Sequence, residues 1–240
     1  MLRGSSCGEL PDHARLTSVL KDVVAQRNAG FGLNMWATIV NRDGEVCAVA
    51  FSGQNRGDQW PGSRVISAQK ANTANAFSLP HLSLSTANLY SAVQPGGSLF
   101  GLQFSNPVDT TVAYEGDARS FGQANDPMMG KRIGGVNVFG GGLALYNSEG
   151  TLLGAIGVSG DTSCTDHIIA WKIRHALALD FVPKGVSPTG DDNIVFDTHV
   201  DQASGHTTSQ GGWGHPACGP DAVEIGNALP TSHPIRKRSV

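Results

Sequence analysis

The first regular pattern in the chain is an apolar stripe near its start. Apolar side chains recur there at the i, i+3, i+4, i+7 and i+8 positions of one helical face, namely Leu16, Val19, Leu20, Val23 and Val24. The pattern predicts a helix over residues 12–28. Asp12 has a side chain suited to a helix N-cap, and Gly30 can adopt the left-handed conformation that follows a helix end.

Two pairs of apolar runs flank short polar turns and predict β-hairpins. The first pair, residues 36–40 and 46–51, encloses Asn-Arg-Asp-Gly, and Asp-Gly is a strong hairpin signal. The second pair, residues 143–146 and 152–158, encloses Asn-Ser-Glu-Gly within a glycine-rich segment, residues 133–163. Glycine permits the backbone to approach another backbone, or a ligand, where a β-carbon would collide.

Two further helices are predicted, over residues 64–78 and 166–179. The first follows Pro-Gly-Ser and contains several alanines, which allow close packing on a sheet. The order of elements is then helix, hairpin, helix, long loop, hairpin and helix. This order predicts an α+β fold, with an antiparallel sheet flanked by helices.

The other segments are poor in regular patterns. Residues 79–132 are loop-rich, with one expected strand over residues 99–104, and a loop of this length is usually functional or forms an oligomer contact. We expect one domain over residues 1–182 with an insertion at about 80–132. Residues 183–240, rich in Gly, Pro, Asp, Ser and His, are expected to form an irregular C-terminal tail packed on the same domain.

Composition narrows the classes of function. The chain has 240 residues, 40% of them hydrophobic, so it can bury a substantial core. Its 17 basic and 20 acidic residues give a net charge of −3, which argues against nucleic acid or an anionic membrane as a partner. It contains no run of about 18 consecutive apolar residues, so we expect no membrane span.

Four cysteines lie far apart along the chain, at Cys7, Cys47, Cys164 and Cys218. They lack the C-x-x-C spacing of a zinc ribbon or a thioredoxin-like motif. We expect at least one disulfide, but the pairing stays open among three connectivities. Disulfides favour an oxidising compartment and hence a secreted or periplasmic protein. The first residues lack the apolar core of a signal peptide, so a cytoplasmic location stays open.

Three stretches resemble the GlcG/HbpS-like family of haem-binding and haem-degrading proteins, which also forms the C-terminal part of PduO-type proteins. They are the hairpin turn at residues 41–44, the helix at residues 66–77, and Gly134-Gly135-Val136 followed by residues 154–160 and then Asp166. The similar region spans about residues 12–180. The resemblance implies a profilin- or PAS-like sheet, assembly into homo-oligomers, and a pocket that holds haem in some relatives.

The resemblance also suggests where a tetrapyrrole or other small molecule would bind. Lys70 lies in the similar helix, and Arg64 precedes it; either cation can pair with a propionate. Histidine is a common axial ligand of haem iron. The free backbone N–H groups around Gly160 can hold an anion or simply be capped by the following Thr and Ser side chains. The candidate binding residues are Arg64, Lys70, Asn72, Asn75, His81, Asn137, Phe139 and Gly160.

A second hypothesis needs no cofactor. Asp161, Asp166 and His167 place two carboxyl groups beside an imidazole, a combination that can move protons on a small carbonyl or carboxylate substrate in an isomerase- or lyase-like reaction. The asparagines named above could polarise a carbonyl. The glycine pattern fits neither a dinucleotide fingerprint nor a phosphate loop nor a nucleophile elbow. The tail histidines show no metal-binding spacing, so no metal site is expected, and a ligand-free oligomeric scaffold is the third hypothesis.

Overall fold

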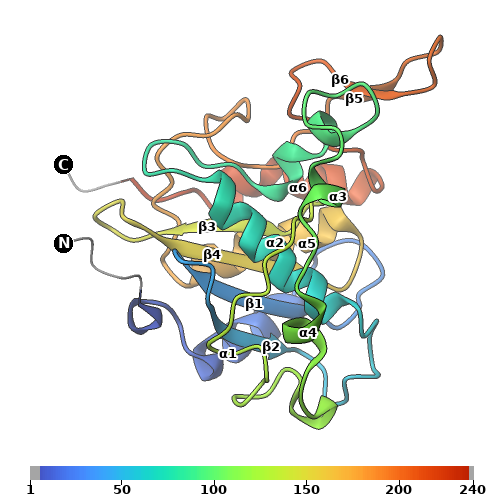
Figure 1. Ribbon diagram of the computed structural model, residues 1–240. Helices are drawn as coiled ribbons and strands as arrows, with labels where there is room; N and C mark the ends of the chain where they lie inside the picture. The colour runs from blue at the N-terminus through green and yellow to red at the C-terminus, as the bar shows by residue number, and fades with distance from the viewer. Residues whose placement is uncertain (1–5, 238–240) are drawn as a thin grey trace, which may run out of the picture.

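The computed structural model describes residues 6–237 and has a four-stranded antiparallel sheet at its centre. The strand order is β2–β1–β4–β3 (Figure 1). Both predicted hairpins are confirmed, because each contributes two neighbouring strands, and β1 then pairs with β4 to join the hairpins. The strands are β1 (Trp36–Asn41), β2 (Val46–Phe51), β3 (Gly142–Tyr146) and β4 (Leu152–Ser159).

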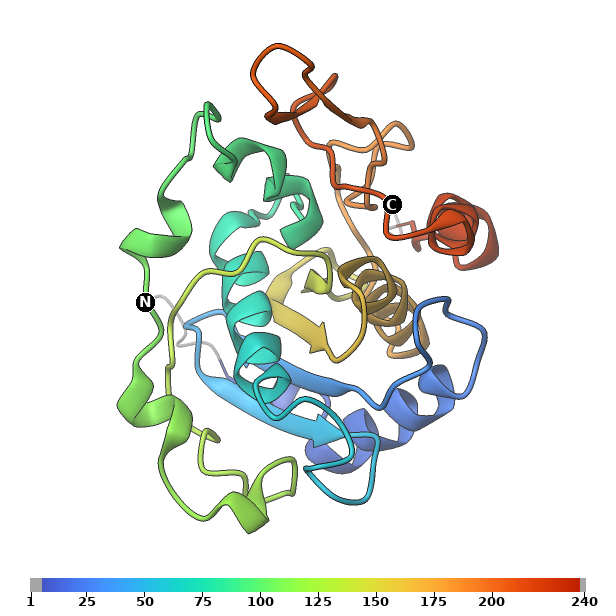
Figure 2. The same ribbon diagram turned by 90° about the vertical axis from the view of Figure 1, so that its right-hand side faces the viewer.

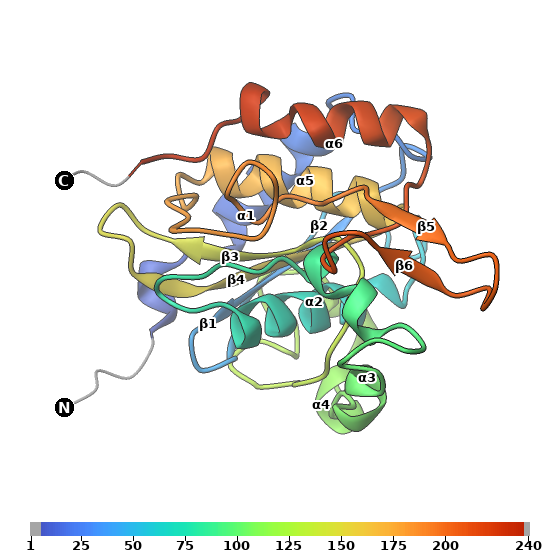
Figure 3. The same ribbon diagram turned by 90° about the horizontal axis from the view of Figure 1, so that it is seen from above.

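Helices cover both faces of the sheet, which confirms the predicted α+β class. Helix α2 (Ser63–Phe77) packs on one face, mainly against β4 and β1. Helices α1 (His13–Val24) and α5 (Ser163–Ala176) pack on the other face, and α6 (Pro220–Ser232) lies outside α5 (Figure 3). The sheet is therefore buried on both sides, and every residue of its four strands is buried.

The alternation of side chains along β1 places them in two different apolar clusters, one on each face of the sheet. Ala37 and Ile39 join the cluster with α1 and α5, whereas Trp36 and Val40 join the cluster under α2. Gly157 of β4 lies so close to α2 that an added β-carbon would overlap the backbone of that helix. The glycine-rich second hairpin thus permits close helix–sheet packing.

The predicted helices are present with shifted ends. Asp12 caps α1 by accepting a hydrogen bond from Arg15 N at 2.8 Å, as predicted. That helix ends at Val24, well before Gly30, although Gly30 does have left-handed backbone with φ +72°. Helix α5 begins three residues earlier than predicted because Thr162 is its N-cap and accepts from Thr165 N.

Residues 80–132, expected from the sequence to be an insertion, wrap around the α2 side of the molecule (Figure 2). The strand predicted at residues 99–104 is wrong: this segment forms turns and the short helix α3 (Leu102–Ser105). Phe100 and Phe104 are exposed, and within residues 6–237 this segment pairs with no strand. The other short elements are η2 (Thr86–Leu89), η3 (Ser91–Val93), α4 (Thr110–Tyr114) and η4 (Ala118–Ser120).

The tail after residue 182 is irregular over most of its length, and its regular elements are ones that the sequence did not predict. They are α6 and a small hairpin of β5 (Thr198–Val200) and β6 (Thr207–Ser209). A buried ion pair holds the tail on α5, since Arg174 Nη2 lies 2.7 Å from Asp192 Oδ1. Trp171 Nε1 also donates to the carbonyl of His233 near the end of the tail, at 2.9 Å.

Two disulfides connect the four cysteines, which confirms the expectation of at least one. Cys7, in the short helix η1 (Cys7–Glu9), pairs with Cys47 of β2, and Cys164 of α5 pairs with Cys218 of the tail. The second bridge therefore ties the tail to the domain. None of the helices within residues 6–237 is long and apolar enough to cross a lipid bilayer.

Candidate functional site

A buried ion pair joins the two helices that carry the family-like motifs. Lys70 Nζ of α2 lies 2.6 Å from Asp166 Oδ2 of α5 and donates to the carbonyl of Val158 at 3.1 Å. The other carboxylate oxygen of Asp166 accepts from Asp161 N at 3.0 Å. Burial raises the pKa of Asp166 to about 6, although the nearby Lys70 charge opposes this shift.

The start of the second hairpin closes over this pair. Gly141 has φ +122°, and an added β-carbon would overlap Val158 O and touch the side chains of Asp166 and Lys70. The next residue, Gly142, donates its N–H to Thr86 Oγ1 at 2.8 Å. The glycines here allow the backbone to pack closely against the pair.

The other two predicted acid–base residues have partners of their own. The Asp161 carboxylate accepts from the backbone N–H groups of Phe31 and Leu33, so it holds the loop that follows α1. Gly160, predicted as an anion site, has its carbonyl bonded by Gln59 Nε2 at 2.6 Å. These contacts give Asp161 and Gly160 a role in loop and strand-end geometry.

His167 points toward the tail. Its Nε2 accepts from Ile194 N at 3.1 Å and lies 3.2 Å from Asn193 Oδ1, while its Nδ1 has no partner among the described residues. Burial lowers the pKa of His167 to about 3, so the imidazole is neutral at physiological pH. The hydrogen bonds of the three side chains thus lead to three different regions of the molecule.

His215 lies near enough to Lys70 for their charges to interact, Tyr90 lies beside His215, and the sequence did not single out either residue. His215 Nε2 is 3.4 Å from Gly140 N, and its ring centroid is 5.0 Å from that of Tyr90. Burial lowers the pKa of His215 to about 4, and the positive charge of Lys70 acts in the same direction. The tail delivers His215 to this place, and its sequence neighbours carry no signal of the contact.

The predicted asparagines serve local structure at separate points. Asn72 Nδ2 donates to Gly135 O at 2.7 Å, and Asn75 Nδ2 donates to Arg42 O at 3.2 Å. Asn137 Oδ1 accepts from Phe139 N at 3.2 Å. Phe139 is 41% exposed with its ring 6.3 Å from that of Tyr90, and His81 lies exposed after α2.

Arg64 lies instead in a different place, an aromatic cleft of about 360 Å³ at the N-terminal end of α2. We use the name aromatic cleft for the hollow lined by Trp36, Asn55, Arg56, Gly57, Pro61, Gly62, Arg64, Val65, Tyr114, Ala118 and Phe121. Its volume lies within the range of about 300–1,000 Å³ that is usual for small-molecule pockets. The insertion supplies Tyr114, Ala118 and Phe121, so this loop forms one wall of the cleft.

The aromatic cleft has few polar groups, and they differ in whether protein partners already occupy their hydrogen bonds. Arg64 is buried, donates to Asp126 Oδ2 at 2.8 Å and to Ala113 O at 2.8 Å, and stacks over the ring of Phe121 at 3.6 Å. The indole N–H of buried Trp36 has no hydrogen-bond partner among the described residues. Tyr114 and Arg56 are exposed at the rim.

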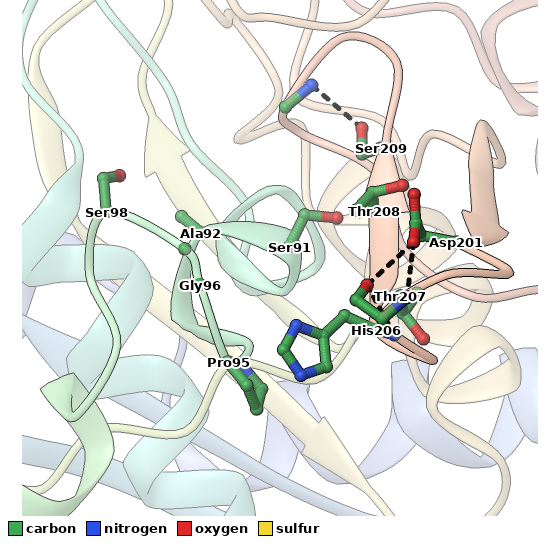
Figure 4. Close-up of a pocket in the computed structure, with 13 residues that line it drawn as sticks. Ser91, Ala92, Pro95, Gly96, Ser98, Asp201, His206, Thr207, Thr208 and Ser209 are labelled. Carbon is green, nitrogen blue, oxygen red and sulfur yellow. Dashed lines mark hydrogen bonds between the residues drawn. The ribbon is translucent and has the colours of Figure 1, made fainter.

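A second hollow of about 340 Å³ lies between the segment of η3 and the β5–β6 hairpin (Figure 4). Its walls are part polar and part apolar, and some of its side chains bond within their own loop, as Ser204 Oγ does to Asp201 Oδ1 at 2.9 Å. None of the predicted site residues lines it.

The sequence was compared with protein families, curated proteins and solved structures. Residues 12–174 match the family described as haem-degrading protein HbpS-like. The chain belongs to the HbpS-like family. No curated protein matches the sequence.

Two solved structures resemble this HbpS-like chain. One is the crystal structure of a PduOC:haem complex, with 24% sequence identity, coverage of 68% of this chain and 89% of that chain, and a TM-score of 0.47. The other is the Klebsiella pneumoniae protein ORFY, with 22% identity, coverage of 74% and 97%, and a TM-score of 0.45.

Proposed function

We propose that this protein binds haem or a related tetrapyrrole in the aromatic cleft. The observation that carries the proposal is the composition of that cleft: aromatic walls at Tyr114 and Phe121, with the exposed cation Arg56 at the rim. A flat apolar macrocycle with carboxylate substituents requires these two properties. Membership in a family of haem-degrading proteins points to the same ligand class.

The residues of the cleft fit this group. Tyr114 carries a phenol, one of the side chains that ligate haem iron in proteins, and Arg56 is placed to pair with a propionate. Arg64 is committed to Asp126 and Ala113, so we assign it to supporting the Phe121 ring. When bound, haem supplies the redox chemistry of its iron, whereas these residues bind it, orient it and exclude water.

Titration of the purified full chain with haemin tests the proposal. We expect saturable binding with a shift of the Soret band. Tyr114→Phe should change the shape of that band, and Arg56→Gln should weaken binding by about tenfold through loss of a charged contact. Tyr90→Phe is the matched control, because Tyr90 lies outside the cleft. Non-saturable binding, or equal binding by all three variants, would contradict the proposal.

A specific observation favours a second function, proton transfer on a small carbonyl or carboxylate compound. The pKa of Asp166, about 6, lies near neutrality, as a general acid or base requires. Lys70 contacts that carboxylate and His215 lies close by, whereas Asp161 and His167 bond elsewhere. Loss of turnover in Asp166→Asn, in a variant that keeps its folded circular-dichroism spectrum and its haemin binding at the assay temperature, would support this function over the first.

We further propose an oxidising compartment, either secreted or periplasmic, and assembly into homo-oligomers. The two disulfides, Cys7–Cys47 and Cys164–Cys218, support the first statement. The family resemblance supports the second. Thiol counting on protein from its native source and light scattering of the purified chain test the two statements separately.

A further inference from the structure

A histidine lies against the disulfide that ties the tail to the domain. Cys164 is in the first turn of α5, and Cys218 lies just before α6, three residues after His215. One ring nitrogen of His215 and the two sulfurs all lie within 4.8 Å of one another. Among residues 6–237, this is the cluster of His, Cys, Asp and Glu side chains whose geometry could hold a metal ion.

The surroundings of the cluster suit a metal site with thiolate ligands. His215 is buried, and its ring is held by contacts of Nδ1 with Pro216 O at 2.8 Å and of Nε2 with Gly140 N at 3.4 Å. Cys164 N donates to Cys218 Sγ at 3.3 Å, and such a donor stabilises a thiolate. Cys218 is exposed, so an ion has a route from solvent.

We propose that reduction of the Cys164–Cys218 disulfide creates a three-ligand site for a zinc-like divalent cation, made of both thiolates and His215. Zinc bonds of about 2.0–2.3 Å place tetrahedral ligand atoms roughly 3.3–3.8 Å apart. This separation is below the 4.8 Å within which the three ligand atoms lie here. Once the S–S bond is broken, the sulfurs need only separate toward the tetrahedral spacing. The fourth position is open to water, as in sites with three protein ligands.

The redox step balances with a dithiol reductant. The dithiol gives two electrons and two protons to the protein disulfide and becomes a disulfide itself, which leaves two protein thiols. The cation then displaces both thiol protons to solvent and binds the two thiolates. Thiol–disulfide exchange with a small-molecule disulfide, which takes up the two electrons and becomes a dithiol, reforms the S–S bond and expels the cation. The cation site therefore forms only when the disulfide between the tail and α5 is broken.

The test uses the full chain, reduced with a water-soluble phosphine, freed of reductant without oxygen, and titrated with Co²⁺. We expect a thiolate-to-cobalt charge-transfer absorption that saturates at one equivalent and disappears when Zn²⁺ is added. The untreated disulfide-bonded chain should show no such band. In a second measurement, Zn²⁺ should raise the Tm of the reduced chain only.

Variants separate this site from the other cysteines. Cys218→Ser should abolish the band, and His215→Asn should lower Co²⁺ affinity at least about tenfold, because loss even of an outer partner costs that much. Cys7→Ser/Cys47→Ser is the matched control and should keep the band. An absent band and an unchanged Tm in the reduced chain would overturn the proposal, as would an unchanged band in Cys218→Ser.

Discussion

The ammonium group of Lys70 lies 2.6 Å from the carboxylate of Asp166, and both side chains are buried. This pair connects α2, on one face of the sheet, with the first turn of α5, on the other. Removing one partner of a buried pair leaves the other charge uncompensated. The pair is therefore a point where the protonation of one carboxyl influences the stability of the whole domain.

Asp166→Asn should remove one specific part of the pH dependence of stability. The pKa of Asp166 is raised from 3.8 to about 6 in the folded state, so folding favours the protonated carboxyl. Its stabilising contribution is complete below about pH 4 and is lost as the pH rises through 6. Relative to the variant, the wild type should lose up to about 3 kcal/mol of unfolding free energy between pH 4 and 7. Urea titrations of both proteins at pH 4 and pH 7 measure this difference. An equal change of unfolding free energy in the wild type and the variant would contradict the prediction.

His167→Gln should protect the protein against acid. Burial lowers the pKa of His167 from 6.5 to about 3, so the unfolded chain binds a proton more readily. The contribution of the neutral ring is complete above pH 6.5 and is lost as the pH falls toward 3. Between pH 7 and 5 the variant should lose about 2 kcal/mol less than the wild type. Chemical unfolding at pH 7 and pH 5 measures this difference. His81→Gln is the control, because His81 is exposed.

Ala118→Phe should block the aromatic cleft. Ala118 lines the cleft from the insertion, and a benzyl group there would occupy space that the ligand needs. We expect haemin affinity to fall at least about tenfold with little change in Tm, because the residue is only half-buried. Ala203→Phe, on an exposed turn of the tail, controls for added hydrophobicity. Equal haemin binding by both variants would mean that haemin binds outside the cleft.

Removing the Cys164–Cys218 bridge should loosen the tail. The bridge closes a loop with a sequence separation of 54, so Cys164→Ala/Cys218→Ala should cost about 4 kcal/mol by loop entropy. Limited proteolysis should then cut faster near the β5–β6 hairpin. Cys7→Ala/Cys47→Ala, with a separation of 40, should lose similar stability without exposing the tail. Equal cleavage of the two variants would mean that the bridge does not hold the tail.

The regular elements that the sequence predicted well are those with strong local signals. The Asn41 side chain accepts from Asp43 N and Glu45 N, so the first hairpin turn is formed within five residues. The helix α6, which packs on α5, was not predicted because only three of its residues are buried, Ala222, Gly226 and Leu229, and two of these are small. The strand expected at residues 99–104 is replaced by turns and the short helix α3, and within residues 6–237 this segment pairs with no strand.

The residues of the candidate site also include some that the sequence predicted and some that depend on the fold. Lys70 and Asp166 were predicted separately from the family-like motifs, and the fold brings their charges together across 96 positions of sequence. His215 could not be predicted, because its place depends on where the tail crosses α5 and on the Cys164–Cys218 bridge. The sequence did not predict the aromatic cleft; of its lining residues only Arg64 was a predicted binding residue, and Asp126 holds its guanidinium.

The amino-acid sequence by itself determined the two hairpins, the three helices that flank the sheet, and the family to which the chain belongs. Periodicity and turn residues act over a few positions, and for that reason they can be seen without the fold. Only the tertiary structure decided which cysteines pair, where His167 and Asp161 direct their hydrogen bonds, and which walls enclose the aromatic cleft. Such contacts join residues far apart in the chain, so they depend on burial and packing that no local pattern contains.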